Sequence, residues 1–126
     1  MQTAAIVMAI VQFMVAMFQL ALVLGAPMGE YAFGGQHKGK LPTRFRVASA
    51  FSFVTLIALG GHYLAQAGVF TPLLPPMVNS WVNWALVAFN VAGLIMNSIS
   101  RSKKERQMWV PVLLLSVVLA FIVALA

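Results

Sequence analysis

The chain has 126 residues, of which 62% are hydrophobic and 8% charged, and its formal net charge at pH 7 is +6. About a quarter of the residues in an ordinary soluble protein are charged, so eight basic and two acidic side chains are too few to cover a water-soluble domain. The composition therefore excludes that class and predicts one domain that lies mostly in a lipid bilayer. Cysteine is absent, which excludes disulfides, thiolate metal ligands and a cysteine nucleophile.

Four apolar segments follow one another along the chain, each close to the ~20 residues that a helix needs to cross a bilayer core. The expected transmembrane helices cover residues 3–24, 47–67, 81–99 and 103–126, and the apolar run of the last one begins at about Met108. Backbone groups find no water inside lipid, so each segment is expected to be helical, and none alternates as a barrel strand would. The predicted fold is an all-α membrane protein with four transmembrane helices in one antiparallel bundle.

The first segment, residues 3–24, carries no charge. It lacks the basic start of a secretory signal peptide, and its apolar run is too long for one. We therefore expect it to be retained as a spanning helix. Gly25, Pro27 and Gly29 follow it and predict its end.

The first connection contains Gly34, four further residues and then Gly39 and Lys40, one residue short of the phosphate-binding loop of nucleotide-binding proteins. Such a loop needs Ser or Thr after the lysine, a strand before it and a helix after it, whereas Leu41 and Pro42 follow here. We therefore expect no nucleotide. A weaker alternative stays open, in which the Gly-rich turn offers its N–H groups to an anion such as a lipid phosphate.

Prolines and one capping motif mark the other helix boundaries. Pro42 and Thr43 stand where the second helix is expected to begin, with Thr43 as its N-cap. Three prolines within residues 70–76 predict the second turn. The sequence SKKE at 102–105 matches a capping box, which predicts that the fourth helix begins near Lys103.

All charged side chains fall in the first and third connections, each of which holds four basic residues and one acidic residue. These connections lie at one end of a four-helix bundle, and basic loops stay in the cytoplasm. We therefore expect both termini outside, in the cell (inner) membrane. The candidate ligands for lipid headgroups or other anions are Lys38, Lys40, Arg44, Arg46, Arg101, Lys103, Lys104 and Arg106. A second explanation is that these cations only set topology within the headgroup layer.

The two acidic residues, Glu30 and Glu105, each lie beside four cations, and a lone carboxylate in such surroundings is expected to be paired. Glu105 can close the capping box with Ser102. Glu30 has no cation close in sequence. We therefore expect Glu30 to reach the third connection, or Arg44 or Arg46, and to tie both turns into one cytoplasmic cap.

Uncharged polar residues recur every seven positions inside two expected spans: Gln12 and Gln19 in the first, and Asn83, Asn90 and Asn97 in the third. Amides in membrane helices usually hydrogen-bond to neighbouring helices, and each bond contributes about 0.6–2 kcal/mol. We expect an interhelical seam in which Asn90 bonds to Gln12 or Gln19. The alternative is the uncharged path of a small channel along the third helix.

Few side chains suit catalysis or metal binding. The apolar runs contain no Asp, Glu, Lys or Arg, which counts against a proton-driven multidrug exporter of the small four-helix type. His37 and His62 are 25 residues apart with most of a spanning helix between them, so they cannot hold one metal ion within a chain. We expect no catalytic residue, no metal and no cofactor.

Two stretches, GAPMGEYAFGGQHKGKLPTRFRVAS at 25–49 and NSISRSKKERQMWVPV at 97–112, resemble the turns of a family of small, largely uncharacterised bacterial four-helix integral membrane proteins. The family pattern is G-A-P-x-G…G-G-x-H…L-P in one turn and N-x-x-S-R-S-x-x-E-R in the other. Members often carry Trp near positions 28 and 33, where this chain has Met28 and Phe33. The resemblance implies no activity or cofactor, and it directs attention to the two turns.

The sequence is thus expected to encode a non-enzymatic membrane protein whose basic loops meet lipid headgroups or a partner protein. Membrane lipids are the expected partners, a second copy or another membrane protein are further candidates, and nucleic acid is not expected. The alternative from another class is a small oligomeric channel or transporter. A hydrated groove that reaches the asparagine seam would favour the channel, and a seam satisfied by neighbouring helices would favour the first function.

Overall fold

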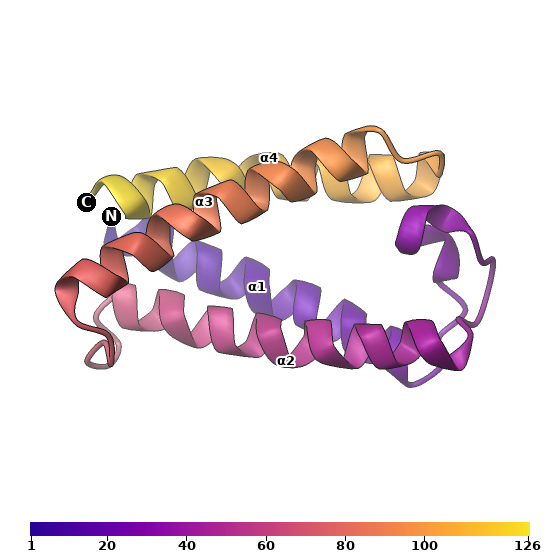
Figure 1. Ribbon diagram of the computed structural model, residues 1–126, viewed down its shortest axis with the longest axis horizontal. Helices are drawn as coiled ribbons and strands as arrows, with labels where there is room; N and C mark the ends of the chain where they lie inside the picture. Colours follow the sequence, from indigo (N-terminus) through magenta and orange to yellow (C-terminus); the bar gives the residue numbers. More distant parts are fainter.

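The computed structural model describes all 126 residues, which form four long helices joined by short connections (Figure 1). The helices are α1 (Gln2–Val23), α2 (Thr43–Gln66), α3 (Pro76–Ser98) and α4 (Lys103–Leu125), and two short 3-10 turns, η1 (Gly29–Tyr31) and η2 (Phe33–Gly35), lie in the first connection. Each long helix has the length and apolar composition to cross a bilayer. The predicted all-α bundle of four spans is confirmed, and the chain is a multi-pass membrane protein.

Successive helices run in opposite directions, so both termini and the second connection lie at one end of the bundle (Figure 1). The first and third connections lie at the other end, together with every charged side chain of the protein. We call this the basic end, and we call the end with the termini the neutral end.

Two helices begin earlier than their apolar runs predict: α2 at Thr43 instead of residue 47, and α3 at Pro76 instead of residue 81. Proline stands at the N-cap of both helices and also at the first position of α3. Its fixed φ suits the first turn, and its missing N–H would have no partner there. The prediction that Thr43 caps α2 is wrong, because Pro42 occupies that position and no side chain caps the helix.

The start of α4 at Lys103 is confirmed, but only half of the capping box forms. Ser102 Oγ accepts a hydrogen bond from the Glu105 N–H at 3.2 Å. The Ser102 N–H donates to Ser100 Oγ at 3.1 Å instead of to the Glu105 carboxylate. That carboxylate is therefore left for another partner.

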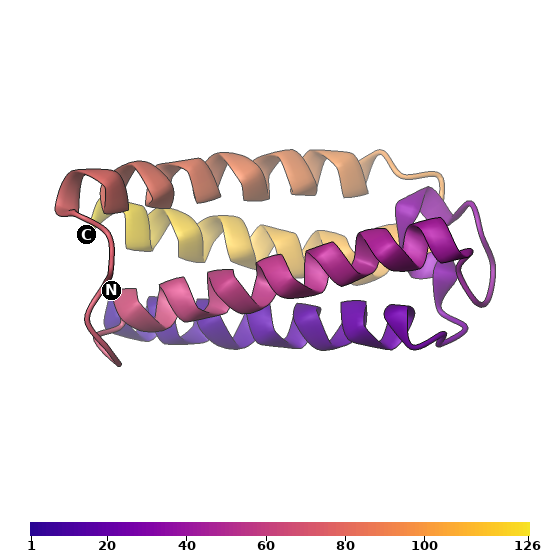
Figure 2. The same cartoon turned by 60° about the horizontal axis from the view of Figure 1, so that its bottom comes forward.

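The bundle consists of two helical hairpins. α1 packs along α2, α3 packs along α4, and α1 also contacts α4, whereas the backbones of α2 and α3 come close at few points. Figure 2 shows the α3–α4 hairpin above the α1–α2 hairpin. The packing of α1 against α2 depends on Gly60, because a side chain there would collide with the ring of Phe13.

The main hydrophobic core occupies the half of the bundle next to the neutral end. Its buried members are Ala4, Ala5, Met8, Ala9, Tyr63, Ala67, Leu86, Leu119, Ala120 and Val123. Small residues let membrane helices approach closely, and the alanines of α1 have this role. The other half of the bundle, next to the basic end, contains a cavity.

Candidate functional site

Four interactions between distant residues join the two basic turns, and three of them involve Glu30 or Tyr31. Ser102 Oγ donates to the carbonyl of Glu30 at 2.6 Å, and the Trp109 Nε1–H donates to the carbonyl of Tyr31 at 2.6 Å. Lys104 Nζ lies 2.7 Å from Glu30 Oε2. The prediction that Glu30 pairs with the third connection is confirmed. We call the joined turns the basic cap (residues 24–42 and 99–109).

Glycines in η2 allow the turns to touch. Gly35 has a φ of +72°, and a Cβ at this position would collide with the Cβ of Ser102. Gly34, at φ +73°, directs its N–H to Glu105 Oε2 at a distance of 3.2 Å. Phe33 adopts a φ of 51°, which is uncommon for a residue with a large side chain. The first turn is therefore shaped to fit the start of α4.

The ion pair of the basic cap is partly exposed to solvent. The hydrogen bond from Lys104 lowers the pKa of the Glu30 carboxyl below its ordinary value of 4.5, against an opposing effect of desolvation. The nearby positive charge of Lys38 lowers this pKa further. Glu30 is therefore favoured as a carboxylate in the folded protein.

Three of the eight predicted anion ligands have partners within the protein. Arg46 directs Nε and Nη2 to the carbonyl of Val23, at 3.0 and 2.7 Å. Arg106 donates to the carbonyl of Ser100, and Lys104 pairs with Glu30. The cations that make no hydrogen bond or ion pair in the protein, and that are exposed, are Lys38, Lys40, Arg44, Arg101 and Lys103.

A shallow depression of about 330 Å³ lies where the two turns meet. Its lining residues are Glu30, Gly34, Gly35, Lys38, Arg101, Ser102, Lys103 and Lys104. Four of these are cations, and three of the four belong to the free, exposed set. The depression therefore has the charge and the size to receive a phosphate group.

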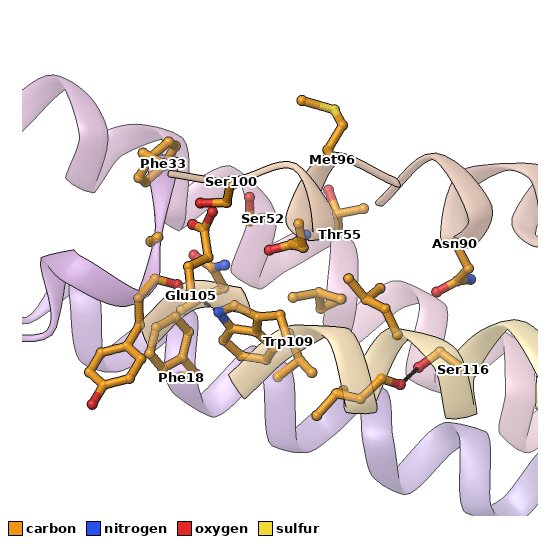
Figure 3. Close-up of a pocket in the computed structure, with 18 of the residues that line it drawn as sticks. Phe18, Phe33, Ser52, Thr55, Asn90, Met96, Ser100, Glu105, Trp109 and Ser116 are labelled. Carbon is orange, nitrogen blue, oxygen red and sulfur yellow. Dashed lines mark hydrogen bonds between the residues drawn. The ribbon is translucent and has the colours of Figure 1, made fainter. Parts of the chain in front are cut away.

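A larger cavity, of about 830 Å³, lies between the two hairpins (Figure 3). Aromatic pairs line its end next to the basic cap: Phe18 and Trp109 with ring centroids 4.8 Å apart, and Phe33 and Phe45 at 4.9 Å. The strongly exposed residues Phe51, Phe89 and Met96 line the side between α2 and α3. The cavity therefore opens sideways toward the surrounding lipid.

Four of the five amides of the predicted seam line this cavity without bridging it: Gln12, Gln19, Asn90 and Asn97. Asn90 donates to the carbonyl of Leu86 at 2.8 Å, within its own helix. The Gln12 amide approaches only the sulfur of Met8, at 3.7 Å, and the buried Oε1 of Gln19 has no hydrogen-bond partner. The prediction that Asn90 bonds to Gln12 or Gln19 is wrong, because α1 and α3 lie diagonally across the bundle.

The third-helix asparagines thus differ in role. Asn97 lines the cavity and donates to the carbonyl of Gly93 at 2.8 Å. Only Asn83 forms the predicted interhelical bonds, through Nδ2 to Gln66 Oε1 at 3.1 Å and through Oδ1 to His62 Nε2 at 2.7 Å. Since that Oδ1 can only accept, His62 carries its proton on Nε2.

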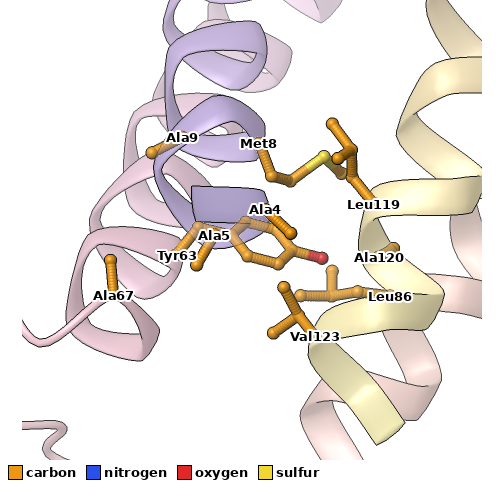
Figure 4. Close-up of a cluster of buried hydrophobic side chains, with 10 residues drawn as sticks. All are labelled: Ala4, Ala5, Met8, Ala9, Tyr63, Ala67, Leu86, Leu119, Ala120 and Val123. Carbon is orange, nitrogen blue, oxygen red and sulfur yellow. The ribbon is translucent and has the colours of Figure 1, made fainter. Parts of the chain in front are cut away.

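The cavity ends halfway across the bundle. Asn90 and Ser116 lie at its deep end (Figure 3), and Gln12 of α1 also lines it. One turn further toward the neutral end come the core residues Met8, Leu86 and Leu119, which Figure 4 shows packed together with Tyr63. The cavity is therefore a blind pocket within one chain.

Glu105 is the most unexpected member of the cavity wall. The sequence places it in the basic third connection, yet its side chain is only 7% exposed and faces the cavity. Its spacing to Trp109 and Ser116, four and eleven residues, places all three on one face of α4. That spacing is the signal that could have identified the cavity wall from the sequence.

No protein-family model, curated protein or solved structure matches the chain. The resemblance of its turns to the family described above therefore stays a prediction, and the function has to be inferred from the geometry of the cap and the cavity.

Proposed function

We propose that this protein is a non-catalytic membrane protein whose basic cap binds the phosphate headgroups of anionic lipids in the cytoplasmic leaflet. The observation that carries this proposal is the depression at the junction of the turns, where Lys38, Arg101 and Lys103 are free. Lipid phosphates are the anions present at the depth of such a cap, and each basic residue near an anionic surface contributes about 1 kcal/mol.

The rigidity of the cap supports a defined site over a diffuse attraction. Hydrogen bonds between the turns fix the backbone around the depression, so its cations converge without a large further loss of conformational freedom. The blind cavity also supports lipid binding over passage through the bundle, because the uncharged path of a channel would have to continue past Leu86 and Leu119.

The test compares two double variants with the same net charge in nanodiscs that contain phosphatidylglycerol and phosphatidylcholine. Lys38→Gln with Lys103→Gln removes two cations of the depression, and Lys40→Gln with Arg44→Gln removes two exposed cations outside it. Native mass spectrometry of the released protein measures retained lipid. We expect the first pair to reduce bound phosphatidylglycerol at least fivefold and the second pair to reduce it less than twofold. Equal losses would contradict a defined site.

A further inference from the structure

We propose that the cavity between the hairpins binds a lipophilic cation, namely an amine or an -onium compound with an apolar body, and that Glu105 is its counter-ion. This site and the depression on the outer surface of the basic cap share only Gly34 among their lining residues, and the proposal stands without the proposed headgroup binding.

Glu105 is a buried carboxylate without an opposite charge. Its Oε2 accepts one hydrogen bond, from the Gly34 N–H, and its Oε1 has no hydrogen-bond partner in the protein. Glu105 forms no ion pair, since the only salt bridge joins Lys104 to Glu30. Burial of an unpaired charge is costly, and ionisable groups inside membrane proteins usually mark a binding site or a transport path. The carboxylate therefore lacks the partner that a cationic ligand would supply.

The charges around the cavity select against anions. The protein has a net charge of +6, yet no lysine, arginine or histidine lines the cavity. Glu105 is the only charged side chain among the 25 lining residues. A negatively charged ligand would face this carboxylate with no compensating cation, whereas a positively charged ligand would neutralise it. The cations of the basic cap lie outside the cavity, where water and salt screen them.

Aromatic rings near Glu105 provide the second element of a cation site. Phe18 and Trp109 form an edge-to-face pair, and Phe33 and Phe45 form a second pair at the same end of the cavity. Ring faces attract ammonium groups, and more strongly so where water is excluded. The Trp109 N–H is already bonded to the carbonyl of Tyr31, which fixes the position of this ring.

The rest of the cavity suits the body of such a compound. Its volume of about 830 Å³ lies within the range of small-molecule pockets, roughly 300–1,000 Å³. The side opening between α2 and α3 is lined by Phe51, Phe89 and Met96, so a membrane-dissolved compound could reach the carboxylate without crossing the basic cap. Gln12 and Asn90 at the deep end offer hydrogen-bonding groups to polar substituents.

The test measures binding of tetraphenylphosphonium to the purified protein in neutral detergent by equilibrium dialysis, with empty micelles as the blank. The neutral isostere tetraphenylsilane is the ligand control. We expect the cation to bind one per chain and Glu105→Gln to weaken its binding at least tenfold. Glu30→Gln, the same substitution at the other acid of the protein, should change the affinity less than twofold.

Ser52→Phe fills the cavity from α2 and leaves Glu105 in place, so it tests the site even if the Glu105 variant does not fold. We expect it to weaken binding of the cation at least tenfold. Three results would overturn the proposal: equal affinity of the wild type and Glu105→Gln, equal losses in Glu105→Gln and Glu30→Gln, or unchanged binding to Ser52→Phe. Binding of tetraphenylsilane as tight as that of the cation would overturn it as well.

Discussion

Three consecutive residues of the first turn, Phe33, Gly34 and Gly35, have positive φ angles. For a residue with a side chain this conformation costs about 1–2 kcal/mol. Phe33 adopts it even so, because its ring lies 4.9 Å from that of Phe45 and packs against the small buried cluster around Leu22 and Leu41. Backbone strain of this kind persists where surrounding contacts hold the residue in place. Here the strained conformation places the first turn against the start of α4.

Substitutions at Gly34 and Gly35 distinguish the free energy lost through backbone strain from the free energy lost through a steric clash between the turns. Gly34→Ala places a methyl group in open space, so only the positive φ opposes it, and we expect a loss of about 1–2 kcal/mol in the free energy of unfolding. Gly35→Ala carries the same strain and also drives a methyl group into Ser102, so we expect a clearly larger loss. Unfolding in mixed micelles with sodium dodecyl sulfate measures both variants, and equal losses would show that the turns do not touch.

The Glu30–Lys104 pair predicts a specific pH dependence. Because the pKa of Glu30 is lowered by folding, its stabilising effect is complete above the ordinary value of 4.5 and disappears as the pH falls through the lower, folded pKa. Since the pair is exposed, Glu30→Gln should lower the Tm at neutral pH by no more than about 2 °C. This difference should vanish in acid. Lys104→Gln should lower the Tm by the same amount. The double variant, Glu30→Gln with Lys104→Gln, should lower it no further than either single variant.

At the scale of whole helices, Arg46 of α2 holds the end of α1. Two of its N–H groups bond to the carbonyl of Val23, the last residue of α1, where the helix dipole favours a cation. Arg46→Met keeps much of the aliphatic stem and removes this bond, so we expect a loss of about 1.5–3 kcal/mol in the free energy of unfolding. Arg44→Met, on an exposed neighbour in the same turn, is the matched control. It removes only the contact of Arg44 with the ring of Phe45, so it should change the free energy of unfolding by no more than about 1 kcal/mol.

The asparagines of α3 provide a second comparison between helices. Asn83 and Asn90 are equally buried, at 6% exposure, but only Asn83 bonds to α2. Asn83→Leu should therefore lower the free energy of unfolding by about 1–2 kcal/mol, and Asn90→Leu by less than about 0.6 kcal/mol. Unfolding in mixed micelles with sodium dodecyl sulfate measures both losses. A larger loss for Asn90→Leu would mean that this amide bonds across the cavity.

The four helices were predictable because they depend on local features, although α2 and α3 begin earlier than the predicted spans. Hydrophobic length, the prolines at 42 and 75–76, and the Ser102 cap each act within a few residues. The seam was not predictable, because equal spacing of Asn83, Asn90 and Asn97 does not reveal which helix each one faces. The Glu30 pair was predictable from charge balance alone. The spacing of Glu105 to Trp109 and Ser116 indicates the face of α4 that they share, but the burial of Glu105 depends on a turn 71 residues earlier in the chain.

At the scale of the molecule, the charge distribution predicts its orientation in the membrane. Cysteine variants at Thr3 and Thr71 test the neutral end, and variants at Gln36 and Thr43 test the basic end; all four positions are exposed and uncharged. In intact cells an impermeant thiol reagent should label the first two and spare the last two, because basic loops stay in the cytoplasm. Permeabilised cells provide the control, in which all four should react. Labelling of both ends in intact cells would indicate dual insertion.

The contacts that shape the first turn also set an order of events during biosynthesis. The partners of the first turn are Glu105, Ser102 and Trp109, at and near the start of α4, which lie 71, 72 and 78 residues further along the chain. The ribosome translates Ser102, Glu105 and Trp109 only after it has completed the first turn and all of α2. Until the start of α4 is synthesised, the strained turn around Phe33 has only its contacts with Phe45 and with the cluster around Leu22 and Leu41. The cap closes only when the second hairpin has joined the first.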